Sequence, residues 1–249
     1  MVDGEKNRKT DRAAAAIRRQ ALLAMALVVP VPTISVIAML FEFQGTAGKI
    51  IAAVCKLWLV LFPLAWLVRI EKQRLRLTRP PRNGMIAGVI SGAVICGAML
   101  GTYQLLRHAI DLEPLREKAA ATGFAQLGAY IGIFVYIVLV NSLLEEYVWR
   151  WFICRQLETV IGTGSRRARS AAVAGAAALF TIHHVFALAA WVDWRFNALA
   201  CLGVFIGAAV WSWLYLRYRS IWPAYVSHVF ADMAVFVMGY QLIFLQAPA

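Results

Sequence analysis

The sequence predicts an all-α protein: a polytopic transmembrane bundle of about seven spans with a cytoplasmic N-terminus. Hydrophobic residues make up 61% of the chain and charged residues only 15%, and the mean hydropathy is +0.68. Soluble domains have about 45–50% apolar and about 25% charged residues. Several stretches are long enough to cross a hydrocarbon core about 30 Å thick. Their apolarity is continuous and not alternating, which favours helices over a barrel.

The apolar stretches leave no connection long enough for a soluble domain. We therefore expect one transmembrane domain over residues 21–245, preceded by a basic cytoplasmic tail over residues 1–20. The expected spans are 21–41, 50–68, 85–106, 127–147, 171–191, 196–216 and 221–245.

The first three spans carry signals for anchoring, kinks and packing. The first span is too long for a signal-peptide core and lacks a small-residue cleavage site, so we expect it to remain as an anchor. Pro30 and Pro32 in this span, and Pro63 in the second, predict kinks. The third span repeats glycine every four residues, an interval that lets helices approach closely. These glycines are Gly84, Gly88 and Gly92, and then Gly97 and Gly101.

The later spans are separated by short connections. Residues 107–123 mix charges of both signs and predict a short surface helix that begins near Pro114. Gly162, Gly164 and Ser165 predict a break before the fifth span. Pro223 lies at the start of the seventh span, where its missing N–H does no harm.

Basic residues are concentrated on one side of the predicted topology. If the N-terminus is cytoplasmic, nineteen of the 25 Lys and Arg residues lie on that side. They are Lys6, Arg8, Lys9, Arg12, Arg18, Arg19, Arg69, Lys72, Arg74, Arg76, Arg79, Arg82, Arg150, Arg155, Arg166, Arg167, Arg169, Arg217 and Arg219. This asymmetry follows the positive-inside rule, and Lys56 lies within the second span. The net charge of +12 therefore indicates topology and contact with the lipid bilayer, and we expect no nucleic-acid partner.

Two adjacent carboxylates lie at the edge of the fourth predicted span. A charge at the bilayer centre costs about 2.5–3.5 kcal/mol, so such residues are interpreted as functional by default. Neighbours in a helix point about 100° apart, so Glu145 and Glu146 cannot share one partner. Glu146 and Arg150 are four residues apart with the acid first, which favours an ion pair and a structural role. Glu145 is then free to face a cavity, and we interpret it as functional.

Histidines form the second and third patterns. His184 follows Phe180 by one helical turn, so the phenyl ring can pack over the imidazole. His183 points elsewhere and is interpreted as a packing residue. His228 and Asp232 are four residues apart, so the carboxylate can accept an imidazole N–H and set its tautomer.

These groups, on three different helices, are the parts needed for hydrolysis. A carboxylate can take a proton from water, and imidazoles can stabilise the oxyanion. The same parts offer an alternative: Glu145, His184 and His228 form a His₂Glu set that can bind Zn²⁺ together with water.

In their order along the chain, the three patterns resemble those of the CAAX protease and bacteriocin-processing (CPBP) family. This family is also called the type II CAAX prenyl endopeptidase or ABI family of intramembrane proteases. The patterns are E-E-x-x-x-R (Glu145, Glu146, Arg150), F-x-x-x-H (Phe180, His184) and H-x-x-x-N/D (His228, Asp232). The resemblance covers about residues 142–233 and places a catalytic core within about residues 127–245.

The resemblance implies roles for these residues. It leaves open whether a metal takes part, and we favour the reaction without one. Glu145 would activate water with help from His184, and His228 with Asp232 would face the oxyanion. Glu146, Arg150 and Phe180 would support the site. Two residues depart from the family pattern: Trp151 stands where a small residue is common, and Asp232 stands where Asn is frequent. An ionised Asp232 would repel an oxyanion, so it must be protonated or have an orienting role.

The function predicted from sequence is therefore an intramembrane endopeptidase that cleaves a membrane-associated peptide or protein in a bacterial cytoplasmic (inner) membrane. No cofactor is expected, with Zn²⁺ as the alternative. A catalytically inactive binding or immunity scaffold with the same fold is a second hypothesis. A haem or quinone carrier using His183, His184 and His228 is a third.

Overall fold

The computed structural model describes residues 2–43, 45–74 and 78–245, and these residues form helices and connections without a strand. Within these described residues, seven helices are long and apolar enough to cross a membrane, which confirms the predicted all-α bundle of about seven spans. They span Thr10–Glu42, Thr46–Arg69, Arg82–Ala109, Leu127–Ile161, Arg166–Ala189, Trp194–Tyr218 and Trp222–Leu245. Arg76, one of the basic residues assigned to the cytoplasmic side, lies outside the described residues.

Several spans are built from more than one helical segment. The first contains most of α1 (Val2–Val28), followed by α2 (Pro30–Ile37) and the π-helix η1 (Ala38–Glu42). The second is α3 (Thr46–Arg69), and the third is α4 (Arg82–Leu106) with the 3₁₀ turn η2 (Arg107–Ala109). The fourth contains α6 (Leu127–Val135), η3 (Tyr136–Asn141), α7 (Ser142–Glu145), η4 (Glu146–Cys154) and α8 (Arg155–Ile161). The last three are α9 (Arg166–Ala189), α10 (Trp194–Tyr218), and α11 (Trp222–Tyr240) with η5 (Gln241–Leu245); the short helix α5 (Leu112–Thr122) precedes the fourth span. Segments η3, η4 and η5 are π-helices.

Two predicted boundaries change. Helix α1 begins at Val2, so nearly all of the predicted tail continues the first span as a helix. The fourth span ends at Ile161 and not at residue 147, because Glu146 and Arg150 pair inside the bundle and do not end the span. Arg150 was assigned to a cytoplasmic connection; this is wrong, since its side chain is fully buried.

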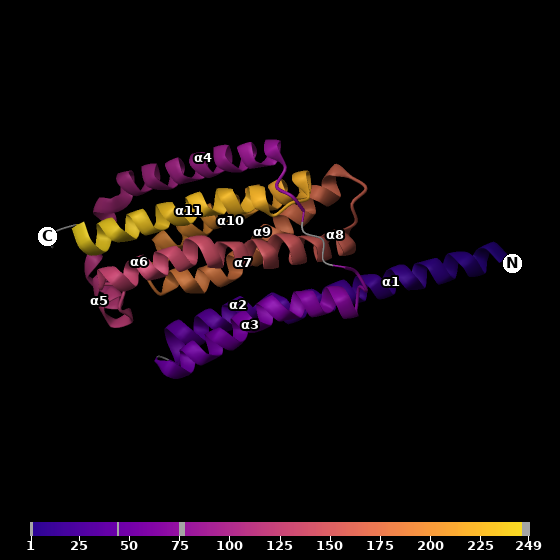
Figure 1. Cartoon of the computed structure of the whole chain (residues 1–249), viewed down its shortest axis with the longest axis horizontal. Helices are drawn as coiled ribbons and strands as arrows, with labels where there is room; N and C mark the ends of the chain where they lie inside the picture. Colours follow the sequence, from indigo (N-terminus) through magenta and orange to yellow (C-terminus); the bar gives the residue numbers. More distant parts are fainter. Residues whose placement is uncertain (1, 44, 75–77, 246–249) are drawn as a thin grey trace.

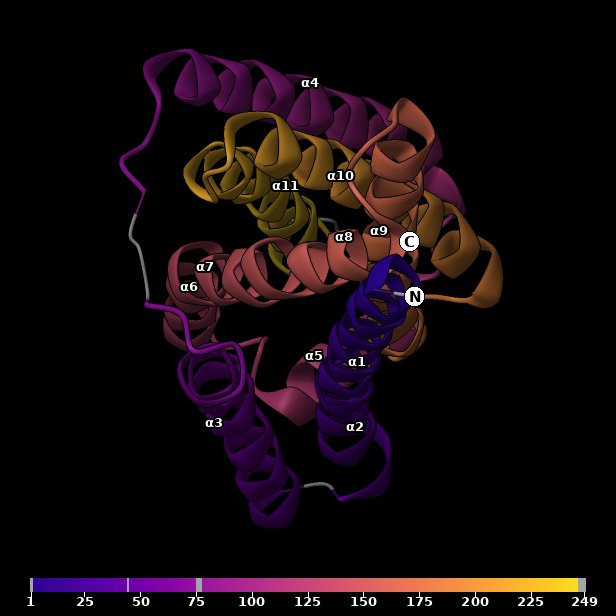
Figure 2. The same cartoon turned by 90° about the vertical axis from the view of Figure 1, so that its right-hand side faces the viewer.

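The helices form a main bundle with a helical hairpin along one side (Figures 1 and 2). The hairpin consists of α1, α2 and α3, while α4 packs along α11 and α9 packs along α10. The two ends of the chain lie at opposite ends of the bundle (Figure 1). The basic connections between α3 and α4 and between α8 and α9 lie at the same end as the N-terminus (Figure 1).

Three glycines of α4 allow its close approach to α11. Gly84, Gly88 and Gly92 are buried, and a Cβ atom on Gly92 would lie 2.9 Å from the ring of Phe230. A Cβ on Gly88 would overlap the backbone carbonyl of Pro223. The prediction of glycine-mediated packing is confirmed for these three residues. It is wrong for Gly97 and Gly101, where a Cβ would meet nothing within 4 Å.

Replacing Gly88 with Val is therefore expected to lower the free energy of unfolding by about 1–3 kcal/mol, as overpacking does. The rigid backbone of Pro223 cannot yield to the added side chain. The matched control is Gly97→Val on the same helix, which has open space around it. Unfolding by SDS titration in mixed micelles measures both variants, and equal losses would contradict the assigned α4–α11 contact.

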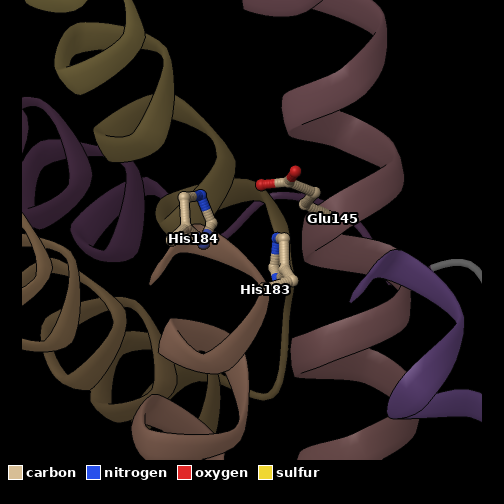
Figure 3. A group of neighbouring side chains, drawn as sticks. All are labelled: Glu145, His183 and His184. Carbon is tan, nitrogen blue, oxygen red and sulfur yellow. The ribbon is translucent and has the colours of Figure 1, made fainter. Parts of the chain in front are cut away.

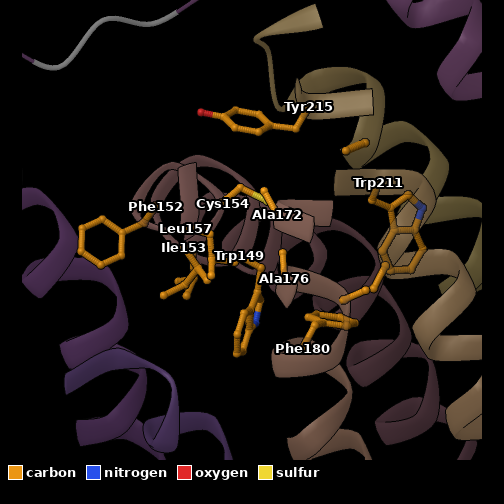
Figure 4. Close-up of a cluster of buried hydrophobic side chains, with 14 of the residues drawn as sticks. Trp149, Phe152, Ile153, Cys154, Leu157, Ala172, Ala176, Phe180, Trp211 and Tyr215 are labelled. Atoms are coloured by element: carbon orange, nitrogen blue, oxygen red, sulfur yellow. The ribbon is translucent and has the colours of Figure 1, made fainter. Parts of the chain in front are cut away.

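The hydrophobic core surrounds the segment that follows Glu145. Figure 4 shows the side chains that η4 and α8 pack against α9 and α10. Ala172 and Ala176 are small residues on α9 that leave room for Trp149, whereas Phe152 points away from them toward α3, where it packs on Phe62. At the end of the bundle that carries the basic connections, Arg219 donates to both carboxylate oxygens of Glu158, at 2.5 and 2.7 Å, and ties the end of α10 to α8. The fourth, fifth, sixth and seventh spans thus form one packed unit.

Candidate active site

The backbone around Glu145 departs from regular α-helix. The four-residue helix α7 ends at Glu145 and lies between two π-helical segments, η3 and η4. The Ser142 hydroxyl lies 2.9 Å from the carbonyl oxygens of both Ile137 and Val138, within the widened turn. Turns of this kind occur frequently at functional sites. No sequence signal predicted them here.

His228 lies at the centre of the polar cluster. Its Nδ1 is 2.9 Å from Glu146 Oε1, and its ring stacks on Trp211 with centroids 3.9 Å apart. Because a carboxylate accepts, Nδ1 is the donor in this hydrogen bond. The other ring nitrogen, Nε2, lies 3.6 Å from Glu145 Oε2 and 3.7 Å from Asp232 Oδ2. The stacked ring and the Glu146 contact therefore aim Nε2 at the two remaining carboxylates.

The prediction of a hydrogen bond between His228 and Asp232 is wrong, since the 3.7 Å between Nε2 and Oδ2 is too long for one. Asp232 instead accepts a hydrogen bond from the Ser142 hydroxyl at 2.6 Å. Glu146, interpreted as structural, takes the orienting role expected of Asp232. The two residues that exchange roles lie on different helices, so helical spacing alone could not assign them.

Glu146 and Arg150 form a fully buried ion pair. Both side chains are 0% exposed, and Arg150 Nε lies 3.4 Å from Glu146 Oε2. The guanidinium also lies over the rings of Phe180 and Trp211, 4.7 and 5.3 Å from their centroids. Its three nitrogens have no hydrogen-bond partner among the described residues. The charge is therefore compensated by the carboxylate and by cation–π contacts.

Glu145 differs from Glu146 in its exposure. Its side chain is 18% exposed, as is that of Asp232, so these carboxylates can meet solvent or a substrate. Glu145 Oε1 accepts from the side-chain amide of Asn141 at 2.8 Å, and Asn141 Oδ1 accepts from Lys56 at 2.5 Å. Asn141 and Ser142 were missed in the sequence. Each lies four residues before a glutamate, a spacing that could have revealed them.

Figure 3 shows Glu145 directed toward His184 and His183. His184 Nδ1 lies 3.1 Å from the Phe180 carbonyl oxygen, and the two rings pack with centroids 4.5 Å apart. A carbonyl accepts, so Nδ1 carries the proton in this bond and Nε2 is left for the site.

One group of described residues has the donor set of a metal site. Glu145, His183 and His184 each offer a ligand atom, and these atoms lie within 4.8 Å of one another. His183 also stacks on Trp149, 5.6 Å between centroids, but its buried Nδ1 has no hydrogen-bond partner among the described residues. A His₂Glu set suits Zn²⁺. The zinc set expected from sequence contained His228 where this group contains His183.

Trp151, the bulky departure from the family pattern, lies apart from these groups. Its ring stacks on Tyr147 with centroids 5.0 Å apart, and the guanidinium of Arg155 lies 5.1 Å from its centroid. The large side chain is accommodated outside the cluster around His228.

The comparison with protein families matches residues 127–234 to the family model described as "Type II CAAX prenyl endopeptidase Rce1-like". The matched segment begins with the fourth span and ends two residues after Asp232. Among the curated proteins and the solved structures, none matches this chain. The matched segment contains every site residue predicted from the sequence: Glu145, Glu146, Arg150, Phe180, His184, His228 and Asp232. Residues 127–234 are therefore a type II CAAX prenyl endopeptidase Rce1-like domain, in agreement with the resemblance carried by the three motifs.

Proposed function

We propose that this protein is an intramembrane endopeptidase that hydrolyses a peptide bond with water activated by Glu145. The family whose model matches is one of endopeptidases, and its name associates it with prenylated CAAX proteins. The observation that carries the proposal is the different environment of two neighbouring carboxylates. Glu146 is fully buried and binds His228 Nδ1, whereas Glu145 is partly exposed and lies 3.6 Å from His228 Nε2. One carboxylate orients the imidazole, and the other is left to act on water.

In the proposed reaction, a water molecule lies between Glu145 and the carbonyl carbon of the substrate. Glu145 takes one proton from this water, and the water oxygen forms a bond to the carbonyl carbon. His228, with both ring nitrogens protonated, donates from Nε2 to the oxygen that becomes negatively charged. His184 carries its proton on Nδ1, so its Nε2 accepts a hydrogen bond from the water and assists Glu145. The C–N bond then breaks, and the proton held by Glu145 passes to the leaving nitrogen. The products are a carboxylic acid and an amine.

We assign Asp232 a role in positioning two helices, while Glu146 orients the His228 ring. Its Oδ2 accepts from Ser142 at 2.6 Å and lies 3.7 Å from His228 Nε2. The carboxylate therefore links the turn that carries Glu145 to the helix that carries His228. This position suits a group that keeps the two helices in register.

A metal-assisted form of the same hydrolysis is the second candidate, because Glu145, His183 and His184 fit a zinc site. A zinc ion bound there would polarise the carbonyl oxygen and acidify its bound water. We favour the metal-free reaction because both oxygens of Glu145 already face groups of the protein, Asn141 and His228.

Removal of metal is therefore expected to leave activity within about twofold of the untreated protein. Purified protein is dialysed against a chelator, and the rate of peptide cleavage is compared before and after zinc is added back. His183→Gln is the accompanying variant, and it should retain more than about a tenth of the activity. Loss after dialysis with recovery on zinc addition, together with an inactive His183→Gln, would favour the metal site.

The experiment that tests the function uses protein reconstituted in lipid nanodiscs. It is incubated with internally quenched peptides of two kinds: farnesylated peptides that end in a C-a-a-X sequence, and unmodified apolar peptides. Mass spectrometry identifies the new peptide termini that cleavage creates, and Glu145→Gln is the control that is expected to be inactive. Cleavage by the wild-type protein alone supports the proposal. Binding without cleavage of either peptide class by the wild-type protein would favour the inactive scaffold.

We also propose a cytoplasmic N-terminus in a bacterial inner membrane. The basic α3–α4 and α8–α9 connections lie at the end of the bundle where the N-terminus lies, as the positive-inside rule requires (Figure 1). Fusion of a periplasm-dependent reporter enzyme to the C-terminus would test this orientation. Reporter activity is expected there and not at the N-terminus.

A further inference from the structure

Lys56 is a charged residue in the middle of a membrane span. It is the eleventh residue of the 24-residue helix α3, and its side chain is partly buried. It lies outside the segment matched to the endopeptidase family, which begins at residue 127. Inserting a lysine at the centre of a span costs free energy, so a lysine found there is expected to have a polar partner and a functional role.

The partner of Lys56 is Asn141, on the fourth span. Lys56 Nζ donates to Asn141 Oδ1 at 2.5 Å, and Asn141 Nδ2 donates to Glu145 Oε1 at 2.8 Å. The ammonium group also lies 5.5 Å from the centroid of the Tyr136 ring. Two hydrogen bonds in series thus connect a cation on α3 to the carboxylate assigned as the base.

The direction of these two bonds is set by the chemistry of the lysine. An ammonium group has three donors and no acceptor, whereas the asparagine amide has a donor end and an acceptor end. With Lys56 present, the oxygen of Asn141 must face the ammonium group, and its nitrogen must face Glu145. Without Lys56, the amide can turn its oxygen toward the carboxylate, where two acceptors repel each other.

We infer that Lys56 is a positioning residue for the proposed peptidase: it fixes the amide of Asn141 so that the amide holds Glu145 Oε1. The inference rests on the proposed function of Glu145. With Oε1 held by Asn141, Oε2 is the oxygen that lies 3.6 Å from His228 Nε2 and is left to accept the water proton. A substitution far from the reacting atoms can lower the reaction rate strongly if it displaces a catalytic group by about 1 Å.

Neighbouring contacts hold α3 where Lys56 can act. The Tyr147 hydroxyl donates to the carbonyl oxygen of Val60 at 2.9 Å. Two residues farther along α3, Phe62 packs edge to face on Phe152, with centroids 6.3 Å apart. Because these contacts do not involve Lys56, α3 is expected to stay docked when the lysine is replaced.

A purely structural role for Lys56 makes a different prediction. If the lysine only docks α3, its replacement should lower stability and activity together. If it positions Glu145, Lys56→Met should slow catalysis while stability is kept or raised, because a charge has been removed from the span.

The experiment compares Lys56→Met, Lys56→Arg and a control, Lys49→Met, in full-length protein in nanodiscs. Lys49 lies on the same helix and is exposed. Kinetics use the farnesylated, internally quenched C-a-a-X peptide. Lys56→Met is expected to lower kcat about tenfold with KM unchanged and no fall in the unfolding midpoint. Lys56→Arg, which keeps a charged donor, should recover most of kcat, and Lys49→Met should match the wild type.

A second readout does not need turnover. In NMR spectra of protein labelled with ¹⁵N-asparagine, the two protons of the Asn141 side-chain amide should have well-separated chemical shifts in the wild type. The signals are assigned by their loss in Asn141→Leu. These chemical shifts should move toward the values of a solvent-exposed asparagine in Lys56→Met and should not change in Lys49→Met. Unchanged signals in Lys56→Met would overturn the inference.

The outcomes separate this inference from the proposed function. If Glu145→Gln is inactive and Lys56→Met keeps a normal kcat, the inference about Lys56 is overturned and the peptidase stands. If Glu145→Gln is as active as the wild type, the proposed function falls, and with it any catalytic purpose for Lys56. In that case the asparagine signals still decide whether the lysine orients the amide.

Discussion

Replacing Glu145 with Gln is expected to lower kcat by about 10³-fold or more and to leave the unfolding midpoint unchanged. General acid–base catalysis contributes about 10²–10⁴-fold, and a glutamine cannot take the proton from water. Its side chain has nearly the same size as glutamate, and its oxygen can still accept from Asn141, which lies 2.8 Å from the carboxylate in the wild type. The measurement is single-turnover cleavage of the farnesylated peptide in nanodiscs, with thermal unfolding of the same preparation.

A control carboxylate and the neighbouring glutamate make this prediction specific. Glu113 is exposed on α5, and Glu113→Gln should behave as the wild type. Glu146→Gln should lower both activity and stability, because it removes the charge that pairs with Arg150 and orients His228. Wild-type kcat in Glu145→Gln would contradict the role assigned to this residue.

Replacing Arg150 with Met is expected to lower the free energy of unfolding by about 3–5 kcal/mol, the range for a buried ion pair that loses one partner. The substitution leaves the carboxylate of Glu146 uncompensated in a site where both side chains are 0% exposed. It also removes a cation from the faces of Phe180 and Trp211. Urea or SDS unfolding, followed by tryptophan fluorescence in mixed micelles, measures this loss.

Arg155 provides the matched control for Arg150. It pairs with Glu71, but the two side chains are 26% and 18% exposed, so Arg155→Met should cost no more than about 1 kcal/mol. The double variant Glu146→Gln/Arg150→Met should recover part of the stability, since the buried charge is gone. Equal losses of unfolding free energy in Arg150→Met and Arg155→Met would show that the buried pair stabilises the protein no more than the partly exposed pair does.

The sequence predicted the fold because membrane spans need continuous apolarity, and this chain has it seven times. The end of the fourth span could not be predicted in the same way. Glu145, Glu146 and Arg150 lower the local hydropathy. The helix nevertheless continues to Ile161, with Glu146 and Arg150 paired inside the bundle and Glu145 bonded to Asn141. The π-helical turns around Glu145 also lacked a signal, since they depend on how the neighbouring spans pack.

In the site, contacts within one helix were easier to predict than contacts between helices. The Glu146–Arg150 pair and the packing of Phe180 on His184 follow from spacings of four residues, and both are present. The same rule assigned His228 to Asp232, whereas the closer partner is Glu146, 82 residues away in the sequence. Lys56 was visible as a charge within a span, but Asn141 as its partner depends on the register between α3 and the fourth span.

The docking of α3 also limits how this protein can be divided for experiments. Family similarity marks residues 127–234 as a module, yet Lys56 and Val60, which bond to that module, come from the hairpin that precedes it. A truncated gene starting at the module boundary would leave Asn141 and Tyr147 facing acyl chains in place of α3. Boundaries taken from the family match alone would therefore cut through the site, and the minimal unit for reconstitution must include the second span.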